Sequence, residues 1–544
     1  MKKVFIRSTT LYLLSFLFVM QAFGQVIPPN ADWVVRYNGP ANKTDNVREI
    51  VVDDQNNIYV TGLSQNKNGN SIATVKYNSG GVQKWAARYS GPKSGDNYPY
   101  GLATDADGNV YVTGRSEGNG TGIDIVTIKY DSSGVQKWAV RYNGSANLND
   151  VPGDLKVNAS GKVFVTGYTN STNLLGPAPA IVTIAYKADG TQDWVRLYDQ
   201  LPNNGAGTNE EEGVSLALDG TGNIYVTGTS AGMVTIKYDP SGQPVWARTI
   251  AGGNGRKVLI DAANNVLVSG WSGKIGKYDS NGTLLWQTTP SLPTASFSDM
   301  ALDGAGNVYV IGICNGINDR SDYVTAKYNT DLTEQWIKSY NGSLNSTDIG
   351  RSIALDGSGN VYVTGYSSVN NGSRNGGLNY GTIKYNNNGV QQWLALYDSP
   401  DKNGSHAFGV VVDAAGNIYV TGESATKATS SDYTTIKYSQ GNASKASFTN
   451  PLQEKSTISK FELRNYPNPF SKNTTIEYQL VHEGKVKLSV FDLSGHEIAT
   501  LVNEYKPAGI YKINFKTNKL PAGTYFYRIQ AGKYIETKKL IILR

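Results

Sequence analysis

Acidic residues recur at the same position in several segments of the sequence, and side chains of this type and spacing could bind a ligand. Each lies about eight residues before the Asp or Asn that opens a tight turn; these acids are Asp45, Asp150, Glu211 and Asp348, with Asp96 one place out of step. Carboxylate oxygens are ligands that Ca²⁺ prefers. If the repeats are arranged radially, the acids form a ring that attracts a cation or a polyhydroxyl ligand. The alternative is that each carboxylate caps its own loop.

One tryptophan, Trp271, stands outside the repeated pattern of the sequence. It falls in the fifth repeat, whose loops at 251–256 and 271–273 are the shortest. A short repeat leaves a notch in a rim built from longer loops, and an exposed Trp in that notch could stack on a sugar ring. Packing of Trp271 against a neighbouring loop is the alternative.

Patterns of catalytic residues are scarce. His406 is the one histidine before the C-terminal tail, and no nucleophile elbow, zinc-binding His pair or phosphate loop appears. Paired carboxylates among the recurring acids could serve glycoside hydrolysis, although the sequence does not fix their separation. The single cysteine, Cys314, excludes an internal disulfide and is typical of a small buried side chain. The sequence favours a binding protein over an enzyme, with no cofactor unless a recurring acid binds Ca²⁺.

A repeated phrase, Asp-x-x-Gly-Asn-Val-Tyr-Val-Thr-Gly, positions these residues. Its clearest copy spans 105–114, and further copies, some looser, begin at Asp53, Asn158, Asp219, Asp261, Asp303, Asp356 and Asp413. A second phrase, Thr-Ile-Lys-Tyr, follows most copies and leads through a turn to a Trp, as at 127–138. Alternating apolar residues and turns of Asp, Asn and Gly predict four short antiparallel strands in each repeat. Such units in a radial array predict a β-propeller.

The number of repeats predicts how the ring closes. Strands of the fourth type each begin with a tryptophan: Trp33, Trp85, Trp138, Trp194, Trp246, Trp286, Trp336 and Trp393. The first precedes every complete repeat, and none follows Tyr438, so pairing the two ends would close eight blades without an exposed sheet edge. Seven blades is the alternative if the fifth repeat is degenerate. The expected fold is all-β, an eight-bladed β-propeller followed by a small C-terminal β-sandwich, with variable loops and the functional site on one face.

Residues 33–438 resemble the bacterial β-propeller repeat family (SBBP-type) of secreted proteins. This resemblance implies a fold more than a function, because propellers host enzymes, adhesins and scaffolds. The pattern Tyr-Asp-x-x-Gly-x-x-x-Trp also faintly resembles the Trp-docking motif of eight-bladed quinoprotein dehydrogenases. Those enzymes commonly use vicinal cysteines, and this chain has only Cys314. An extracellular enzyme, glycan-active or quinoprotein-like, is therefore kept as the alternative function.

The two ends of the chain differ from the repeat region. Residues 1–24 have the cationic start, short apolar run and small-residue cleavage site of a secretory signal peptide. That run is too short to span a bilayer comfortably, and no later segment could do so, so no membrane span is expected in the mature chain. Polar residues at 440–462 predict a linker. The expected divisions are a signal peptide at 1–24, a propeller at 25–439, a linker at 440–462 and a C-terminal domain at 463–544.

The tail opens with a short proline motif, Tyr466-Pro467-Asn468-Pro469-Phe470, and closes with apolar residues at 540–543. Together with the segments 490–495 and 520–525, these residues resemble the type A C-terminal sorting domain of the type IX secretion system of Bacteroidetes. The resemblance implies export to the cell surface or the medium. It also implies that the type IX machinery and a sortase-like protease recognise the tail, and that anionic lipopolysaccharide can be attached after its removal.

The net charge of +6 is concentrated at the two ends of the chain. From Arg464 onward there are 13 Lys and Arg against 6 Asp and Glu, and the signal peptide adds three cations, which leaves about −4 for the repeat region. No basic stripe appears there, so we expect no nucleic-acid partner. The sequence favours a secreted or surface-bound binding or scaffold propeller that recognises glycans or other surface polymers.

Overall fold

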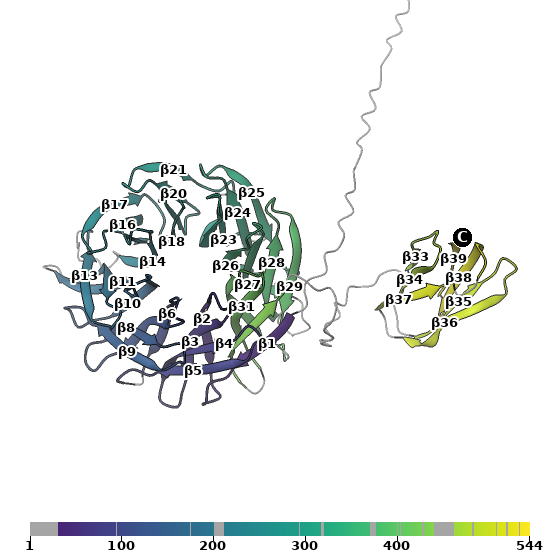
Figure 1. Ribbon diagram of the computed structural model, residues 1–544, viewed down its shortest axis with the longest axis horizontal. Helices are drawn as coiled ribbons and strands as arrows, with labels where there is room; N and C mark the ends of the chain where they lie inside the picture. Colours follow the sequence, from purple (N-terminus) through teal and green to yellow (C-terminus); the bar gives the residue numbers. More distant parts are fainter. Residues whose placement is uncertain are drawn as a thin grey trace, which may run out of the picture. The chain divides into compact units, whose positions relative to one another are not determined.

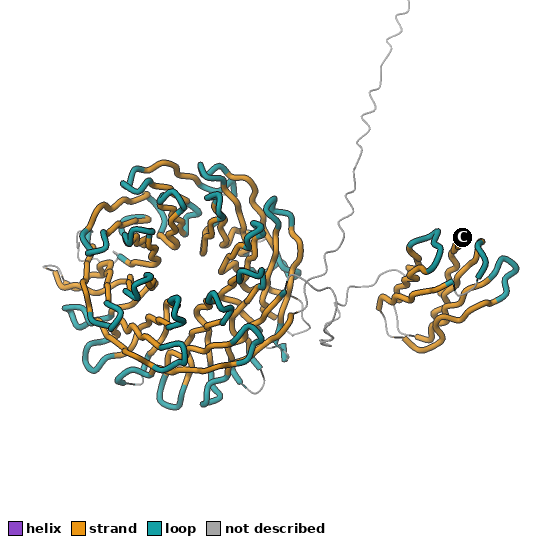
Figure 2. The backbone as a smooth tube through the Cα atoms, in the orientation of Figure 1, coloured by secondary structure: helices purple, strands orange, loops and turns teal. Residues whose placement is uncertain are grey.

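The computed structural model describes residues 31–439 and 462–543, with gaps at 94, 174–175, 201–210, 293, 317–319, 370–376, 400, 403, 427–428, 481–483, 507–508, 518–519 and 533. The described residues form strands and turns and no helix, which confirms the all-β class (Figure 2). No helix in these ranges has the length and apolar character needed to cross a membrane.

The chain divides into two compact units between Ala446 and Ser447. The predicted signal peptide at 1–24 lies outside the described residues, and so does the predicted linker at 440–462 except for Glu462, which begins the first strand of the second unit. The boundaries of the four predicted segments stay predictions.

The described part of the first unit contains eight four-stranded antiparallel sheets. The innermost strands of these sheets are β2 (Asp45–Val52), β6 (Asn97–Thr104), β10 (Asp150–Val157), β14 (Glu212–Leu218), β18 (Gly255–Ile260), β22 (Ser296–Leu302), β26 (Ile349–Leu355) and β30 (Ser405–Val412). The second strands are β3 (Ile58–Gln65), β7 (Val110–Glu117), β11 (Val163–Asn173), β15 (Ile224–Thr229), β19 (Val266–Gly270), β23 (Val308–Asn315), β27 (Val361–Val369) and β31 (Ile418–Ser424).

The outer half of each sheet comes from the second phrase of the repeat and from the Trp strand. The third strands are β4 (Asn70–Tyr77), β8 (Ile123–Tyr130), β12 (Gly176–Tyr186), β16 (Met233–Tyr238), β20 (Ile275–Tyr278), β24 (Ser321–Tyr328), β28 (Gly377–Tyr385) and β32 (Asp432–Tyr438). The outermost strands are β5 (Gln83–Tyr89), β9 (Gln136–Tyr142), β13 (Gln192–Tyr198), β17 (Pro244–Ile250), β21 (Leu284–Thr288), β25 (Glu334–Tyr340), β29 (Gln391–Tyr397) and β1 (Ala31–Tyr37).

The sheets are arranged in a ring around a common centre, with the innermost strands facing it (Figure 1). Each innermost strand packs against the next, and β2 packs against both β6 and β30. Strand β1, from the start of the chain, pairs antiparallel with β32, with Val34 opposite Ile436. The first strand thus supplies the outer edge of the last sheet, as predicted.

A side-chain network at the inner hairpin explains why the first phrase recurs. In the clearest copy, Asp105 Oδ1 accepts the backbone N–H groups of Asp107 and Asn109, at 3.1 and 2.9 Å. Asp105 Oδ2 accepts hydrogen bonds from the Asn109 amide and the Tyr111 hydroxyl, both at 2.8 Å. Burial raises the pKa of Asp105, but these hydrogen bonds outweigh burial and lower it. The recurring Asp is therefore bonded within its own turn, and the Tyr of the phrase ties that turn to the strand.

Six of the recurring Trp residues, Trp286 and Trp393 not among them, contact the outer turn of the neighbouring sheet. Trp85 Nε1 donates to the Ser132 carbonyl of the next sheet at 3.1 Å. Its ring lies against Gly134, which has φ +87° and has no room for a side chain, because a Cβ there would lie 2.6 Å from Trp85 Cδ2. Equivalent Trp–Gly contacts occur at Trp33–Gly81, Trp138–Gly190, Trp194–Gly242, Trp246–Gly282 and Trp336–Gly389. A Gly is needed in this outer turn both for its backbone conformation and for the close approach of the ring.

The described residues of the second unit form two antiparallel sheets. One has the order β33 (Glu462–Tyr466), β34 (Asn473–Leu480), β37 (Gly509–Lys516), and the other the order β36 (Glu497–Lys506), β35 (Gly484–Phe491), β38 (Gly523–Ala531), β39 (Tyr534–Ile542). Buried residues from both sheets, among them Ile476, Leu488 and Leu540, form one hydrophobic core. This core gives the unit its own source of stability.

Candidate functional site

A cavity of about 730 Å³ lies at the centre of the first unit. Residues from all eight innermost strands line it, together with Trp271, which follows β19. Each innermost strand enters from the face of the variable loops and ends at a tight hairpin, so its early residues lie toward the variable-loop opening. We call this opening the channel mouth. The volume falls within the about 300–1,000 Å³ range of ligand sites.

A β-bulge occurs at the same place in every innermost strand. In β2 the register shifts between Val47 and Glu49, which leaves Arg48 as the extra residue. The extra residues of the eight strands all line the cavity; they are Arg48, Tyr100, Gly153, Val214, Arg256, Ser298, Arg351 and Phe408. A bulge re-aims the side chain of its extra residue. The extra residues of the eight bulges therefore occupy equivalent positions in the channel wall. The large side chains among them are mostly Arg or aromatic.

Each of the three bulge arginines lies over an aromatic ring. The guanidinium carbon of Arg48 is 5.5 Å from the centre of the Tyr100 ring. The corresponding distance is 4.8 Å from Arg256 to Trp271. Arg351 lies 5.7 Å from the centre of the Tyr366 ring, whose other contacts include His406. Attraction between a cation and a ring face holds each guanidinium in place without neutralising its charge.

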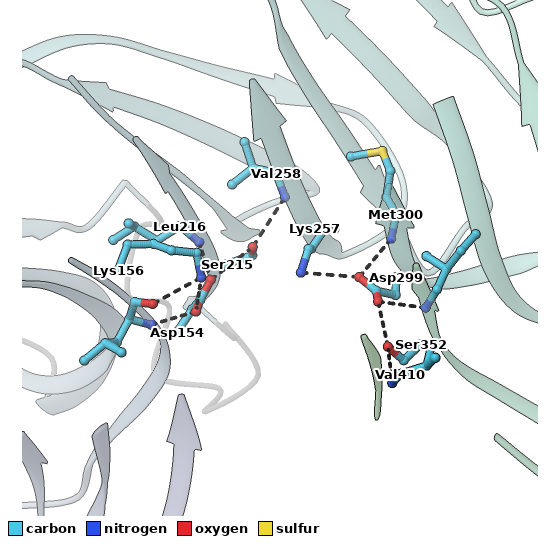
Figure 3. A network of polar contacts seen from close by, with 12 residues as sticks. Asp154, Lys156, Ser215, Leu216, Lys257, Val258, Asp299, Met300, Ser352 and Val410 are labelled. Carbon is cyan, nitrogen blue, oxygen red and sulfur yellow. Dashed lines mark hydrogen bonds and ion pairs between the residues drawn. The ribbon is translucent and has the colours of Figure 1, made fainter. Parts of the chain in front are cut away.

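Below the bulges, ion pairs and hydrogen bonds link neighbouring inner strands (Figure 3). On β10, Asp154 Oδ1 lies 2.8 Å from Lys156 Nζ. Asp154 Oδ2 accepts the backbone N–H of Leu216 on β14 at 2.9 Å. Burial raises the pKa of Asp154, but the charges of Lys156 and Lys257 outweigh it and lower that pKa. This carboxyl is therefore ionised and bonded within the wall.

The same arrangement continues on the next strands. Lys257 Nζ on β18 lies 3.3 Å from Asp299 Oδ1 on β22. Asp299 Oδ2 accepts hydrogen bonds from the Ser352 hydroxyl and the Ile353 backbone N–H of β26, at 3.3 and 3.2 Å. The Asp299 charge raises the pKa of Lys257 against the opposing effect of burial. We call Asp154, Lys156, Lys257 and Asp299 the polar belt; its charges are paired within the protein.

Glu49 follows Arg48 on β2 and adds a further titratable group to the cavity wall. Burial and the Asp154 carboxylate raise the pKa of Glu49 to about 7, against the lowering effects of Lys156, Lys257 and Arg48. Near neutral pH this carboxyl is thus close to half protonated. A change in its charge alters the balance of charge in the channel at physiological pH.

Four of the recurring acids lie inside the loops at the start of the inner strands and do not line the cavity. Asp45, Asp150, Glu211 and Asp348 are at most 1% exposed. Asp45 accepts the backbone N–H of Gly39 at 2.6 Å, and Asp150 and Asp348 accept equivalent bonds from Gly144 and Gly342 at 2.8 Å. Glu211 accepts a hydrogen bond from the Ser230 hydroxyl at 2.6 Å. These are the contacts that loop capping requires, and ligand binding by these acids stays a prediction.

Two further predicted residues lie elsewhere. Asp96 Oδ2 is 2.7 Å from the Arg115 guanidinium in a partly exposed ion pair. Asn97 stands at the position equivalent to Asp45, and its amide donates to the Ser90 carbonyl at 2.8 Å. Trp271 is 50% exposed and lines the cavity, so of the residues proposed from the sequence it is the one that the structure places at the channel. Sugar stacking by Trp271 stays a prediction.

The arginines were missed because sequence reasoning followed the acids. Arg48 and Arg351 stand three residues after Asp45 and Asp348, and Arg256 has the same place in the fifth repeat. Aligning the repeats on their hairpin Asp and allowing one extra residue in the inner strand would have brought the three together. Among the described residues, no cluster of three or more His, Cys, Asp or Glu side chains could hold a metal ion.

Two protein families match the chain. The family described as a β-propeller repeat matches residues 32–70, 84–120 and 335–373. The family described as a secretion system C-terminal sorting domain matches residues 464–543. The chain carries β-propeller repeats and a type IX sorting domain. The sorting domain directs export to the cell surface or the extracellular space and implies contact with the type IX secretion machinery.

The sorting motif predicted at 466–470 is part of the second unit's structure. Phe470 is buried in the core, whereas Tyr466 is 43% exposed. The Asn468 side chain donates to the Lys539 carbonyl at 2.8 Å and accepts the Ile541 backbone N–H at 2.9 Å. The motif thereby bonds to the final strand β39, and recognition of the motif by a sortase stays a prediction.

Distant likenesses to solved structures were also found. BamB from Moraxella catarrhalis has 15% identity and a TM-score of 0.45, over 75% of this chain and all of that one. The C-terminal WD40 domain of Sif2 has 11% identity and a TM-score of 0.47, over 73% of this chain and 97% of that one. PorZ of Porphyromonas gingivalis has 13% identity and a TM-score of 0.34, over 91% of this chain and 74% of that one. It is described as an essential surface component of the type IX secretion system. Likenesses this distant assign no activity. No curated protein matches the chain significantly.

Proposed function

We propose that this protein is an exported binding or scaffold propeller that recognises glycans or other surface polymers at the channel mouth. The observation that carries this proposal is the cavity of about 730 Å³, whose wall combines aromatic rings with polar and charged side chains. Sugars bind through such mixtures, since their C–H faces pack on aromatic rings and their hydroxyls form hydrogen bonds. Trp271, half exposed at the short fifth repeat, supplies a ring face for this purpose.

The experiment is a screen of the purified full-length protein on an array of neutral and acidic glycans, followed by titration of whichever glycans bind. Trp271→Ala is expected to weaken binding by about tenfold, by analogy with aromatic side chains that stack on nucleic-acid bases, which contribute about 1–3 kcal/mol. The matched control is Trp286→Ala. Trp286 belongs to the same repeat as Trp271 and is also 50% exposed, but it stands on the outer strand β21, away from the cavity. Absence of any bound glycan, or equal effects of the two substitutions, would contradict the proposal.

We further propose that the first unit is a closed eight-bladed propeller and the second a small β-sandwich. Eight four-stranded sheets among the described residues and the pairing of β1 with β32 support the first statement. Two sheets with a shared core support the second. The family of the tail suggests that a sortase removes it and that the propeller is then attached to anionic lipopolysaccharide or released. Mass spectrometry of the exported protein would show whether the chain ends before residue 463.

A glycan-active enzyme is a second candidate because of one observation. The pKa of Glu49 is raised to about 7 and that of Asp154 is lowered, and both line the same cavity. An acid that stays protonated near neutral pH beside an ionised carboxylate is the combination that glycosidases use. Against it, Asp154 is held in the polar belt by Lys156 and Leu216. Release of reducing ends from a bound glycan, abolished in Glu49→Gln, would favour the enzyme.

A further inference from the structure

We propose that the ligand of the channel mouth is an anionic saccharide, and that Arg48, Arg256 and Arg351 bind its carboxylate or sulfate groups. This proposal rests on the proposed function and adds the charge of the ligand. All three arginines occupy the bulge position of their inner strand and line the same cavity.

The three arginines have no hydrogen-bond or ion-pair partner among the described residues, whereas comparable arginines elsewhere in the ring are bonded. Arg141 lies 2.7 Å from the Asp124 carboxylate, and Arg88 donates to the Ser64 hydroxyl at 2.6 Å. Arg256 Nε is buried without a hydrogen-bond partner. A buried donor that stays unsatisfied costs stability, so a group that satisfies it gains binding energy.

The aromatic contacts of these arginines use none of their N–H groups in a hydrogen bond to another residue. The Arg256 guanidinium lies over the Trp271 ring, and the Arg48 guanidinium lies over the Tyr100 ring. A guanidinium donates its hydrogen bonds in its own plane, so a ring stacked on its face does not block them. Each ring therefore orients its arginine and keeps it available for a planar oxyanion, which a guanidinium binds through two parallel hydrogen bonds.

The charges around the arginines leave a surplus of positive charge. Within the polar belt the two lysines are paired with the two carboxylates, at 2.8 and 3.3 Å. Arg48 and Arg256 come from β2 and β18, on opposite sides of the ring (Figure 1). Burial lowers the pKa of Arg256; Glu212 opposes this effect and Arg48 adds to it. Glu49, half protonated near pH 7, offsets the arginines only in part. An anion between the guanidinium groups would relieve their repulsion.

The form of the cavity favours a saccharide as the carrier of these anionic groups. Tyr100, Phe408 and Trp271 present rings at the same opening as the arginines. Stacking on rings combined with charge-assisted hydrogen bonds from arginines fits a sugar that bears carboxylates or sulfates. A neutral sugar would leave the guanidinium groups desolvated and unpaired, which costs affinity.

The test is calorimetric titration of the full-length protein with two acidic probes and their neutralised counterparts. Trigalacturonate is compared with its methyl ester, and a heparin-derived tetrasaccharide with its desulfated form. We expect an acidic probe to bind about tenfold or more tightly than its counterpart, since hydrogen bonds between charged groups are about twice as strong as neutral ones. Tighter binding of trigalacturonate would indicate recognition of carboxylates, and tighter binding of the heparin tetrasaccharide would indicate recognition of sulfates. This comparison uses the unaltered protein, so it does not depend on the folding of any variant.

Variants then locate the site. We expect the affinity for the acidic probe to fall by about tenfold in each of the variants Arg48→Gln, Arg256→Gln and Arg351→Gln. Lys338→Gln, which removes an exposed cation on the outer strand β25, is expected to change binding less than about twofold. Equal binding of acidic and neutral probes, or acidic binding indifferent to the arginines, would overturn the inference. Tighter binding of hexaglutamate than of either saccharide would overturn the saccharide assignment. Neutral glycans bound on the array with no acidic probe bound would overturn this inference alone; an empty array would overturn the proposed function as well.

Discussion

Replacing Glu49 by Gln is expected to stabilise the protein at alkaline pH and to have little effect at acid pH. The pKa of Glu49 rises from an ordinary value of 4.5 to about 7, because the side chain is partly buried in the channel wall and lies near the Asp154 carboxylate, and Lys156, Lys257 and Arg48 compensate only in part. The folded protein therefore holds this proton more tightly than the unfolded chain does. As the pH rises from about 4.5 to 7, the folded state loses stability at this group, and above pH 7 the full cost of burying the charge is present.

The magnitude follows from the pKa change. One pKa unit corresponds to about 1.4 kcal/mol, so the rise from 4.5 to about 7 corresponds to at most about 3.5 kcal/mol. Solvent in the channel screens part of this cost, and we expect about 1–2 kcal/mol. Gln has nearly the same shape and is neutral at every pH. Glu49→Gln should thus exceed the free energy of unfolding of the unaltered protein by less than about 0.5 kcal/mol at pH 5 and by about 1–2 kcal/mol at pH 8.

The assay is urea denaturation followed by tryptophan fluorescence at pH 5, 6, 7 and 8. Glu117→Gln is the control, because Glu117 pairs with Lys93 at the surface of the ring. The control should differ from the unaltered protein by a similar small amount at each pH. A Glu49→Gln difference that does not grow with pH, or a variant that is less stable at pH 8, would refute the reasoning about the channel charges.

Two further predictions concern the frame of the ring and its one thiol. Gly134→Ala should cost more than Gly306→Ala, because both glycines have φ above +80° but a Cβ at 134 meets Trp85 at 2.6 Å while the nearest atom at 306 is 3.5 Å away. We expect about 1–2 kcal/mol for the backbone at both sites and about 1–3 kcal/mol more at Gly134, measured by thermal unfolding; equal losses would contradict the Trp–Gly contact. Burial, with a contribution from Asp322, raises the pKa of Cys314 to about 11, so it should react with a disulfide reagent at pH 8 only after unfolding. Rapid reaction of the folded protein would show that the thiol is accessible.

Much of the fold could be predicted because its signals are local. The carboxylate of Asp105 is bonded to residues at most six positions away, so its turn is visible as a short phrase wherever it recurs. The Trp of the outer strand and the Gly of the following outer turn also recur together, because the ring must lie on a residue without a Cβ. The eight tryptophans therefore indicated the number of sheets and the pairing of the first strand with the last.

The site was less predictable because a backbone irregularity decides which residues face the channel. From Asp45, strict alternation would place Val47 and Glu49 on the same side of β2. The bulge at Arg48 interrupts this alternation, so Asp45 and Val47 are buried while Arg48 and Glu49 line the cavity. A bulge leaves no mark in the composition of a strand. Only comparison of all eight repeats reveals that an Arg occupies this place three times.

The most direct test of the binding site is a crystal structure of the full-length protein with bound trigalacturonate. We expect density for the saccharide in the channel mouth, with a carboxylate within hydrogen-bond distance of at least one of Arg48, Arg256 and Arg351. We also expect a sugar ring on Trp271 or Tyr100. Density at the outer strands beside Trp286, or a channel without ligand in a complex that is saturated in solution, would contradict the account.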